Sequence, residues 1–334
     1  MACYRLYGLA IAISQPLTLL DPIELKYGDC DVFFEFTDNA NSIVQPNTLW
    51  TESPQSEKGI TVKHSDDWVY LAYSKSEFET IGFYINTNGT KVICHKPDSI
   101  PHSDAQSFII GPVLGCVLRL RHQICLHASV MEYNGKAFAF VGNKGAGKST
   151  TAAALLNAGA RLISDDVAVM DGHNANSSVV QSGYPGVRLL PSTLSAFGLN
   201  EHDYERVVSG MNKRYVPLHD ALALIKTPSK PCAHAKWRFQ SQAHSLDIIY
   251  SLQTREPNTQ QVTITNLDKR AALMAITPHG YGRRVLNTEQ RADEFAYLAQ
   301  LSQRLTIKSI ACPNKLALLP EIANAILADV SAVT

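Results

Sequence analysis

Short apolar runs separated by polar positions characterise the first third of the chain. Four of them lie between residues 4 and 95: "YRLYGLAIAI", "CDVFFEF", "WVYLAYS" and "FETIGFYINTNGTKVICH". In the last run, Asn88-Gly89 separates two alternating segments, which is a strong signal for a β-hairpin. The pattern predicts a small β-rich N-terminal domain over residues 1–105.

The spacing of apolar residues changes to a helical period directly after this region. In residues 108–123, the positions that share one helical face are Ile110, Val113, Leu114, Val117 and Leu118. Pro112 can occupy the first turn, where a proline is tolerated. This pattern predicts a helix over residues 108–123.

Two apolar runs, "ICLHASVMEY" and "KAFAFVG", then flank Asn134-Gly135 and predict a second hairpin. The next segment, "KSTTAAALLNAG", contains good helix formers and ends with Gly159 at the position of a C-terminal cap. The pattern of "ARLISDDVAVMDG" is that of a strand. The predicted order is therefore strand, glycine-rich loop, helix and strand, in an α/β domain that covers residues 106–334.

The C-terminal third contains weaker signals of both kinds. The runs "HSLDIIYSLQ" and "QQVTITNL" predict further strands. The segment "TEQRADEFAYLAQLSQRL" predicts a helix capped by Thr288, with Phe295, Leu298 and Leu305 on one face. A final helix is expected after Pro320.

Composition and charge narrow the classes of function. A chain of 334 residues is long enough for two domains, and 45% hydrophobic with 18% charged residues is typical of a globular protein. The 30 basic and 30 acidic side chains cancel, which argues against a nucleic-acid or membrane-surface partner. The seven cysteines form no C-x-x-C pair, so we expect a reducing compartment, the cytoplasm. A homo-oligomer is compatible with the sequence.

The segment "FVGNKGAGKST", residues 140–150, matches the Walker A pattern G-x-x-x-x-G-K-[ST]. Glycines let successive N–H groups point at phosphate oxygens, Lys148 supplies a cation for the β/γ-phosphates, and the Ser149 hydroxyl is a Mg²⁺ ligand. We expect ATP or another nucleoside triphosphate as the ligand; the alternative is a glycine-rich turn with an exposed lysine. The expected nucleotide-binding residues are Gly142, Asn143, Lys144, Gly145, Ala146, Gly147, Lys148, Ser149 and Thr150.

Two adjacent aspartates, Asp165-Asp166, follow the predicted helix. Neighbouring side chains of a strand face opposite sides, so the two carboxylates can share a role only if the strand has ended. One can reach the metal while the other faces an acceptor. A nucleotide hydrolase needs a single aspartate for Mg²⁺, whereas a kinase also needs a base for the acceptor's hydroxyl proton. The pair favours a kinase; alternatively, one aspartate caps a turn and the other is solvated.

The run "LHASVMEYNGKAFAFVGNKGAGKSTTAAALLNAGARLISDDVAV" resembles the catalytic domain of HPr serine kinase/phosphorylases. It is most similar to the HPr-kinase-like proteins found with peptide natural-product pathways, including lasso-peptide kinases. The features that coincide are the Leu-His before a hairpin, the glycine-rich loop, the Ala-Gly-x-Arg-Leu helix exit and the Asp-Asp pair. The match is specific over residues 108–172 and looser around "GYPGVRLLPSTL" and "LTIKSIACPNKLALLP", and residues 1–105 match only in kind.

The resemblance implies a P-loop domain of the HPr kinase and phosphoenolpyruvate carboxykinase-like type. By this resemblance Lys148 would hold the transferred phosphate, Asp165 would help to bind Mg²⁺, and Asp166 would be the base toward a substrate hydroxyl. His127 would orient the loop and the carboxylate, although a histidine on an apolar strand is by itself more often a core residue. Arg188 is a candidate clamp for transition-state charge, or else a surface arginine. The downstream Glu-Ile-Arg-Gly-type segment is not evident, which argues against HPr as substrate and leaves a reverse phosphorylase activity unsupported.

The leading hypothesis is an ATP- and Mg²⁺-dependent kinase that phosphorylates an alcohol hydroxyl. The acceptor would be a serine-like residue of a peptide or a small hydroxylated metabolite. The first alternative is a nucleotide-gated regulatory or assembly protein that yields no phosphorylated product. A weaker alternative is a phosphoenolpyruvate carboxykinase-like enzyme, whose extra histidine and lysine metal ligands are not evident in the chain.

Overall fold

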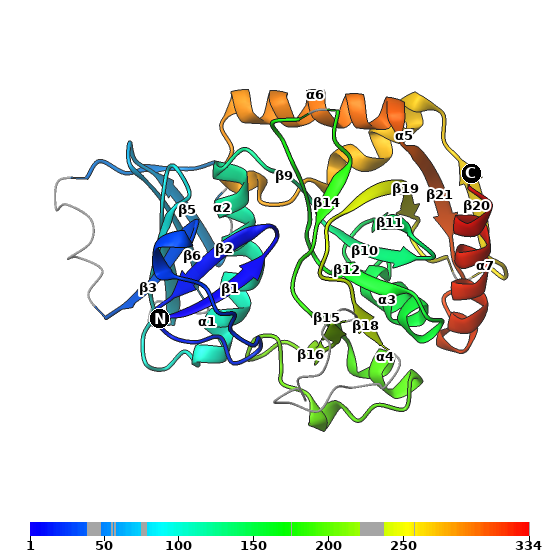
Figure 1. Ribbon diagram of the computed structural model, residues 1–334, viewed down its shortest axis with the longest axis horizontal. Coiled ribbons are helices and arrows are strands. Elements are labelled where there is room, and N and C mark those ends of the chain that lie inside the picture. The colour runs from blue at the N-terminus through cyan, green and yellow to red at the C-terminus, as the bar shows by residue number, and fades with distance from the viewer. Residues whose placement is uncertain are drawn as a thin grey trace. The chain divides into compact units, whose positions relative to one another are not determined.

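The computed structural model describes residues 1–38, 48–54, 56, 58–74, 79–174, 176–220, 237–256 and 258–333. The chain forms two compact units, shown in Figure 1. The first contains residues 1–123 and 282–291, and the second contains residues 124–281 and 292–334. The expected domain boundary after residue 105 lies inside the first unit and stays a prediction. Within the described ranges no helix has the length and apolar character needed to cross a bilayer.

The first unit is built on an eight-stranded sheet in the order β1-β2-β3-β8-β7-β6-β5-β4. The hairpin predicted at Asn88-Gly89 is confirmed, since β7 and β8 pair antiparallel and Gly89 has a φ of 66°. A short 3-10 turn, η1 (Tyr27–Asp29), precedes β3. The strands are β1 (Ala2–Leu6), β2 (Leu9–Ile13), β3 (Val32–Thr37), β4 (Thr51–Glu52), β5 (Ile60–His64), β6 (Trp68–Ser74), β7 (Thr80–Asn86) and β8 (Lys91–His95).

A helical segment follows the sheet in the first unit. It consists of α1 (His102–Phe108), a π-helical stretch η3 (Ile109–Val113) and α2 (Leu114–Leu120). The predicted start at residue 108 was wrong, because Pro112 lies inside the helical segment and not in its first turn. A proline has no N–H to donate, and the wider π turn accommodates the missing hydrogen bond without ending the helix.

The second unit contains a mixed sheet whose described strands follow the order β17-β18-β12-β10-β11-β19-β14-β13-β9. Strand β21 pairs in parallel with β19, and β20 pairs antiparallel with β21. A separate two-stranded sheet is formed by β15 (Gly186–Leu189) and β16 (Arg214–Pro217). The strands of the mixed sheet are β9 (Ile124–Leu126), β10 (Ala128–Tyr133), β11 (Lys136–Val141), β12 (Arg161–Ser164), β13 (Ala168–Met170), β14 (Val179–Gln181), β17 (His219–Asp220), β18 (Arg238–Phe239), β19 (His244–Leu252), β20 (Thr263–Asn266) and β21 (Thr306–Ala311).

Helices pack on both faces of this mixed sheet (Figure 1). Phe138 and Phe140 of β11 belong to one core with residues of α3 and α7, whereas Ala139 and Val141 belong to a second core with residues of α5 and α6. A strand buried on both faces has no polar alternation, which explains the continuous apolar run of β11. The helices are α3 (Lys148–Asn157), α4 (Pro191–Ala196), α5 (Lys269–Ile276), α6 (Thr288–Arg304) and α7 (Leu319–Ala332), with 3-10 turns η4 (Glu201–Asp203), η5 (Thr277–His279), η6 (Arg283–Val285) and η7 (Leu316–Leu318).

The predicted order of strand, loop, helix and strand is confirmed by β11, residues 142–147, α3 and β12. Strand β11 is the second strand of the predicted hairpin, in which Asn134 and Gly135 have φ values of 51° and 83°. Positive φ at both central residues matches the twist of the flanking strands. The hairpin places β11 in the middle of the sheet, and the glycine-rich loop follows at its carboxyl end.

The strand predicted over residues 160–172 is interrupted at the two aspartates. Strand β12 ends at Ser164 and pairs with β10, whereas β13 begins at Ala168 and pairs with β9 and β14. The prediction of a single strand was wrong because Asp166 adopts a φ of 77°, which an extended strand does not allow. The chain therefore turns between β12 and β13.

The N-terminus of α6 also differs from the prediction. Thr288 is the first helical residue and not the cap, because the Asn287 side chain accepts a hydrogen bond from the Gln290 N–H and the Gln290 side chain accepts one from the Asn287 N–H. These reciprocal bonds satisfy two donors at the helix start. Of the expected apolar face, Leu298 is buried but Phe295 is 51% exposed.

A partly buried polar network connects α7 to the sheet. The Lys308 Nζ lies 2.8 Å from both carboxylate oxygens of Asp329, and the Tyr250 hydroxyl donates to Asp329 Oδ2 at 2.6 Å. Burial raises the pKa of Tyr250, and the Asp329 carboxylate raises it further, so the hydroxyl keeps its proton. The Tyr250 ring stacks on Phe140 with centroids 5.4 Å apart, which links this network to β11.

We expect Leu155→Ala to lower the free energy of unfolding by about 2–5 kcal/mol, because the side chain is fully buried between α3 and the sheet and its removal leaves a cavity. Urea denaturation followed by circular dichroism measures this loss. The matched control is Met274→Ala, which truncates a side chain that is 66% exposed on α5 and is expected to change stability by less than about 0.5 kcal/mol. Equal losses in the two variants would contradict this packing.

Candidate active site

The glycine-rich loop, residues 142–147, joins the carboxyl end of β11 to the first turn of α3. Gly145 and Gly147 have φ values of 89° and 99°, in the left-handed region that favours glycine. The Ala146 N–H donates to the Asn143 carbonyl at 3.1 Å and closes the loop on itself. Asn143, Lys144 and Gly145 are exposed, so the outer part of the loop is open to a ligand.

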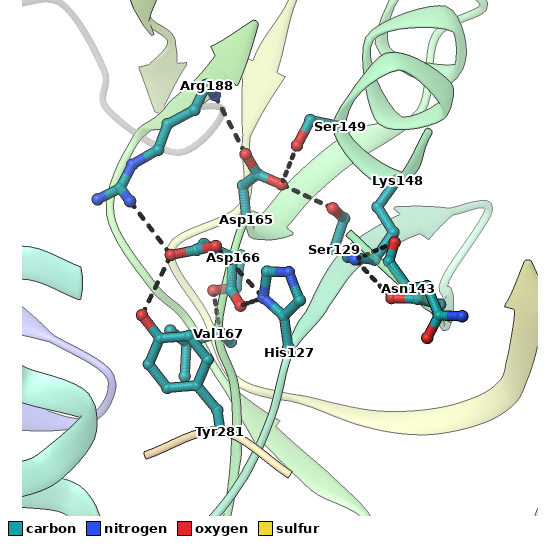
Figure 2. Close-up of polar contacts among 12 residues, drawn as sticks. His127, Ser129, Asn143, Lys148, Ser149, Asp165, Asp166, Val167, Arg188 and Tyr281 are labelled. Carbon is teal, nitrogen blue, oxygen red and sulfur yellow. Dashed lines mark hydrogen bonds and ion pairs between the residues drawn. The ribbon is translucent and has the colours of Figure 1, made fainter. Parts of the chain in front are cut away.

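Lys148 begins α3, and its side chain folds back along the loop (Figure 2). Its Nζ donates to the carbonyl oxygens of Gly142 at 2.7 Å and Asn143 at 3.4 Å, and the residue is only 7% exposed. Burial lowers the pKa of Lys148, while the Asp166 and Asp165 carboxylates act in the opposite direction. The ammonium is thus held against the loop with two anions near it.

Asp165 directs its carboxylate toward the N-terminus of α3. Its Oδ1 accepts hydrogen bonds from the hydroxyls of Ser129 at 2.6 Å and Ser149 at 3.3 Å, and its Oδ2 accepts one from the Arg188 N–H at 3.1 Å. The residue is 1% exposed. Asp165 is therefore a buried carboxylate fixed by three donors, one of which is the serine of the loop motif.

Asp166 directs its carboxylate into a different group of side chains (Figure 2). Its Oδ2 lies 3.1 Å from Arg188 Nη1 and accepts from the Tyr281 hydroxyl at 3.3 Å, and its Oδ1 lies 3.3 Å from His127 Nδ1. The same His127 nitrogen lies 2.9 Å from the Asp166 carbonyl oxygen and donates to it. The left-handed φ of Asp166 therefore separates two adjacent carboxylates into two environments.

The charge of Asp166 is set by competing effects. Burial raises the pKa of this carboxyl, but Arg188 first, and then His127, Lys213 and the Tyr281 hydroxyl, lower it, so that the pKa lies below its ordinary value. The side chain keeps 20% of its exposure. Asp166 is consequently ionised at neutral pH and accessible from solvent.

His127 is held from two directions between β9 and β10. Its backbone N–H donates to the His279 carbonyl at 2.7 Å, and its ring stacks on Tyr281 with centroids 5.9 Å apart and an interplanar angle of 29°. Its Nδ1 faces Asp166, as described above. His127 therefore contacts Asp166 through both its carboxylate and its carbonyl, and its expected role in orienting the loop and the carboxylate stays a prediction.

Arg188 lies on β15 and is mostly buried, with 11% side-chain exposure. Besides its ion pair with Asp166, its guanidinium lies 5.4 Å from the centre of the Tyr184 ring. Thr150, in contrast, directs its hydroxyl to Thr193 of α4 at 3.1 Å. Lys148, Ser149, both aspartates, His127 and Arg188 therefore gather at one place, while Thr150 contacts the neighbouring helix.

Three residues of this region were missed from the sequence. Ser129 could have been found, because it lies two positions after His127 and side chains two apart in an extended segment point the same way. No sequence pattern around Tyr281 or Arg255 identifies either of them as a site residue. Arg255 follows β19, the parallel neighbour of β11, and its Nε donates to the Ala146 carbonyl of the loop at 3.3 Å.

Ser149 and Asp165 fit a Mg²⁺ site by their chemistry. Mg²⁺ prefers oxygen ligands and is usually bound through one or two protein groups together with substrate phosphates and water. The Ser149 hydroxyl and the Asp165 carboxylate offer two such oxygens 3.3 Å apart beside the glycine-rich loop. These residues can hold the metal once phosphates supply the remaining ligands.

We expect Arg188→Ala to raise the pKa of the Asp166 carboxyl, because Arg188 is the main charge that lowers it. Titration of carboxyl carbons by NMR measures the change. A carboxyl with a lowered folded-state pKa stabilises the fold above its unfolded pKa, and this stabilisation is lost as the pH falls through the folded value. In the variant this stabilisation should be smaller, and its loss should be complete at a higher pH than in the wild type. Arg270→Ala, at an exposed position of α5, is the control, and an unchanged Asp166 titration in Arg188→Ala would contradict the assigned ion pair.

Comparison with known proteins adds one structural likeness. No protein-family model matches the chain, and no curated protein matches it. Among solved structures, the chain is similar to the HPr(Ser) kinase/phosphatase from Coxiella burnetii, with 10% sequence identity and a TM-score of 0.30. The match covers 62% of this chain and 99% of that chain. At this TM-score the likeness carries no argument about the activity of the chain, and the case for function depends on the site itself.

Proposed function

We propose that this protein is an ATP- and Mg²⁺-dependent kinase that transfers the γ-phosphoryl group to an alcohol hydroxyl. The observation that carries the proposal is the separation of the two aspartates. Asp165 faces Ser149 at the glycine-rich loop, whereas Asp166 faces Arg188, His127 and Tyr281. A kinase needs one carboxylate on the donor side and a second on the acceptor side, and this arrangement supplies both.

On the donor side, the glycine-rich loop acts as a P-loop. Its amides and the N-terminus of α3 bind the phosphates, and Lys148 moves from the loop carbonyls to the β- and γ-phosphate oxygens. Ser149 and Asp165 would hold Mg²⁺, which when bound neutralises negative charge on the phosphates. These groups position the γ-phosphorus for in-line attack.

On the acceptor side, Asp166 accepts the proton of the attacking hydroxyl. As the bond from the acceptor oxygen to the γ-phosphorus forms, the bond from that phosphorus to the bridging oxygen breaks, and ADP leaves with the electron pair. Asp166 suits this role better than Asp165, because its side chain is 20% exposed whereas Asp165 is 1% exposed and already fixed by three donors. Its lowered pKa keeps it ionised before the reaction.

Arg188 lies beside this carboxylate and can also interact with the transferred phosphoryl group. Its guanidinium is planar and always charged, which suits charge that spreads over the equatorial oxygens in the transition state. His127 contacts the other carboxylate oxygen, Oδ1, and Tyr281 shares Oδ2 with Arg188, each at 3.3 Å. The aspartate thus keeps its orientation if Arg188 shifts toward the phosphate.

The acceptor that we propose is a serine-like hydroxyl of a peptide or a small hydroxylated metabolite, in the cytoplasm. This part of the proposal follows from the resemblance of residues 126–169 to HPr-kinase-like proteins of peptide natural-product pathways. Neither nucleic acid nor a membrane is expected as a partner, because the formal net charge is zero.

We expect Asp166→Asn to abolish phosphoryl transfer while nucleotide affinity stays within about threefold of the wild type, because the side chain acts on the acceptor and not on the donor. The measurement is incubation with γ-labelled ATP and a panel of serine-containing peptides and hydroxylated metabolites, with mass spectrometry of the adduct. The control, Asp203→Asn, changes an exposed aspartate of η4 and should leave transfer unchanged.

The outcome of this experiment separates the proposal from its main alternative. Transfer by Asp166→Asn at the wild-type rate would remove Asp166 as the base. ATP turnover by the wild type without any phosphorylated product, and without stimulation by any acceptor, would favour a nucleotide-gated regulatory protein.

The donor side gives a separate expectation. Asp165→Asn and Ser149→Ala should each raise the Mg²⁺ concentration needed for half-maximal activity by about tenfold or more, because each removes a ligand or its charge. A Mg²⁺ titration of the transfer rate at fixed ATP measures this shift. Ser331→Ala, which changes a hydroxyl at the C-terminal end of α7, is the control. An identical Mg²⁺ requirement in wild type and both variants would rule out this pair as the metal site.

A further inference from the structure

Arg255 links the glycine-rich loop to the neighbouring strands of the sheet. It follows the carboxyl end of β19, which is parallel to β11 and to β21. Its Nε donates to the Ala146 carbonyl at 3.3 Å, and its Nη1 donates to the Pro313 carbonyl, beyond the end of β21, at 3.2 Å. One guanidinium therefore connects three segments that follow three adjacent parallel strands.

The guanidinium also packs directly on the backbone of Gly147. A Cβ atom added to Gly147 would lie 2.5 Å from Arg255 Nη2 and 3.0 Å from its Cζ. Real Cβ atoms do not approach other heavy atoms this closely, so a side chain at this position would displace the arginine. Gly147 is thus constrained twice, by its left-handed φ of 99° and by the arginine that covers it.

The third nitrogen of this guanidinium, Nη2, is buried and finds no hydrogen-bond acceptor among the described residues. Among the described residues, packing and the two other hydrogen bonds therefore hold the guanidinium in place. A buried nitrogen without a protein acceptor calls for an explanation, which can be a water, an ion or a functional task. The task indicated by the contacts is control of the loop, because two of the three nitrogens face Ala146 or Gly147.

We propose that Arg255 is a positioning residue that holds the Ala146–Gly147 peptide in the conformation that binds nucleotide phosphates. This inference depends on the proposed function only in that a nucleotide binds the glycine-rich loop. Arg255 fixes the Ala146 carbonyl on the side away from the ligand, which leaves the loop N–H groups free to converge on phosphate oxygens. It acts through the loop and not through its own contact with the ligand.

A lysine cannot replace this arginine. The planar guanidinium donates to Ala146 and Pro313 from two different nitrogens while its face covers Gly147. An ammonium is a compact point charge without a flat face or a fixed fork of donors. A role that needed only positive charge near the phosphates would be kept by lysine, so this substitution separates positioning from simple charge.

The test measures binding of a fluorescent ATP analogue and of the matching nucleoside to the whole protein and to variants of Arg255. We expect Arg255→Ala and Arg255→Lys to weaken ATP-analogue binding by about tenfold or more, which corresponds to the loss of one charge-assisted hydrogen bond. Nucleoside binding should not change, and added guanidinium should partly restore ATP-analogue binding to Arg255→Ala. Arg270→Ala, at an exposed arginine of α5, is the matched control and should bind as the wild type does.

A double-mutant cycle tests the contact with Gly147 directly. Gly147→Ala should weaken binding both by backbone strain and by its clash with the guanidinium. Because Arg255→Ala removes the clash, the double variant should lose less affinity than the product of the two single losses. Losses that multiply exactly as independent effects would show that the two residues do not interact and would overturn the proposal.

The outcomes also distinguish this inference from the proposed function. If the wild type binds no nucleotide, the proposed function and the positioning role both fail. If the wild type binds and both Arg255 variants bind equally well, the positioning role fails and the proposed function stands. If Arg255→Lys binds with wild-type affinity while Arg255→Ala binds weakly, Arg255 acts only through its positive charge, and the positioning role fails. Thermal denaturation of each variant accompanies these measurements, and a variant that is not folded is replaced by Arg255→Gln.

Discussion

The left-handed backbone of Asp166 is the constraint on which the candidate active site depends. For a residue with a side chain this conformation costs on the order of 1–3 kcal/mol, and it persists only where the surroundings require it. Here the His127 Nδ1–H donates to the Asp166 carbonyl at 2.9 Å, and the Ser164 hydroxyl donates to the Val167 carbonyl at 2.6 Å. These two bonds replace the strand pairing that β12 would otherwise continue. As a result, Asp165 turns toward α3 and Asp166 toward Arg188, and one dipeptide places carboxylates in two different environments.

The sheet assembles the remaining groups from distant parts of the sequence. Parallel strands have their carboxyl ends at the same edge, so the loop after β11, Arg255 after β19 and Pro313 after β21 meet there. Tyr281 reaches the same region because its N–H donates to the Cys125 carbonyl at the edge strand β9 at 2.7 Å. The site therefore combines a short continuous motif with contacts that only the folded topology creates.

Short sequence patterns were sufficient to predict the elements that contacts between neighbouring residues determine. The Asn-Gly turns predicted both hairpins, and the loop motif with its flanking strand and helix predicted β11 and α3. The break after β12 could not be predicted, because aspartate has only a weak preference for positive φ and the bond that holds it comes from His127, far away in sequence. Pro112 suggested a helix start because a π turn is too rare to be expected. The cap of α6 could have been predicted from the sequence, because Asn287 and Gln290 have the spacing of a capping box. Thr288 has no glutamate or glutamine three residues later.

The central position of β11 has a consequence for how the chain opens locally. Phe140 and Val141 are fully buried, β11 is paired on both edges, and the Tyr250, Asp329 and Lys308 network packs behind it. Its amide hydrogens should exchange with solvent only when the whole unit unfolds. Only two residues further on, Asn143 is exposed. The free energy of local opening therefore falls steeply between Val141 and Asn143, so the loop can change conformation around a ligand while its point of attachment stays fixed.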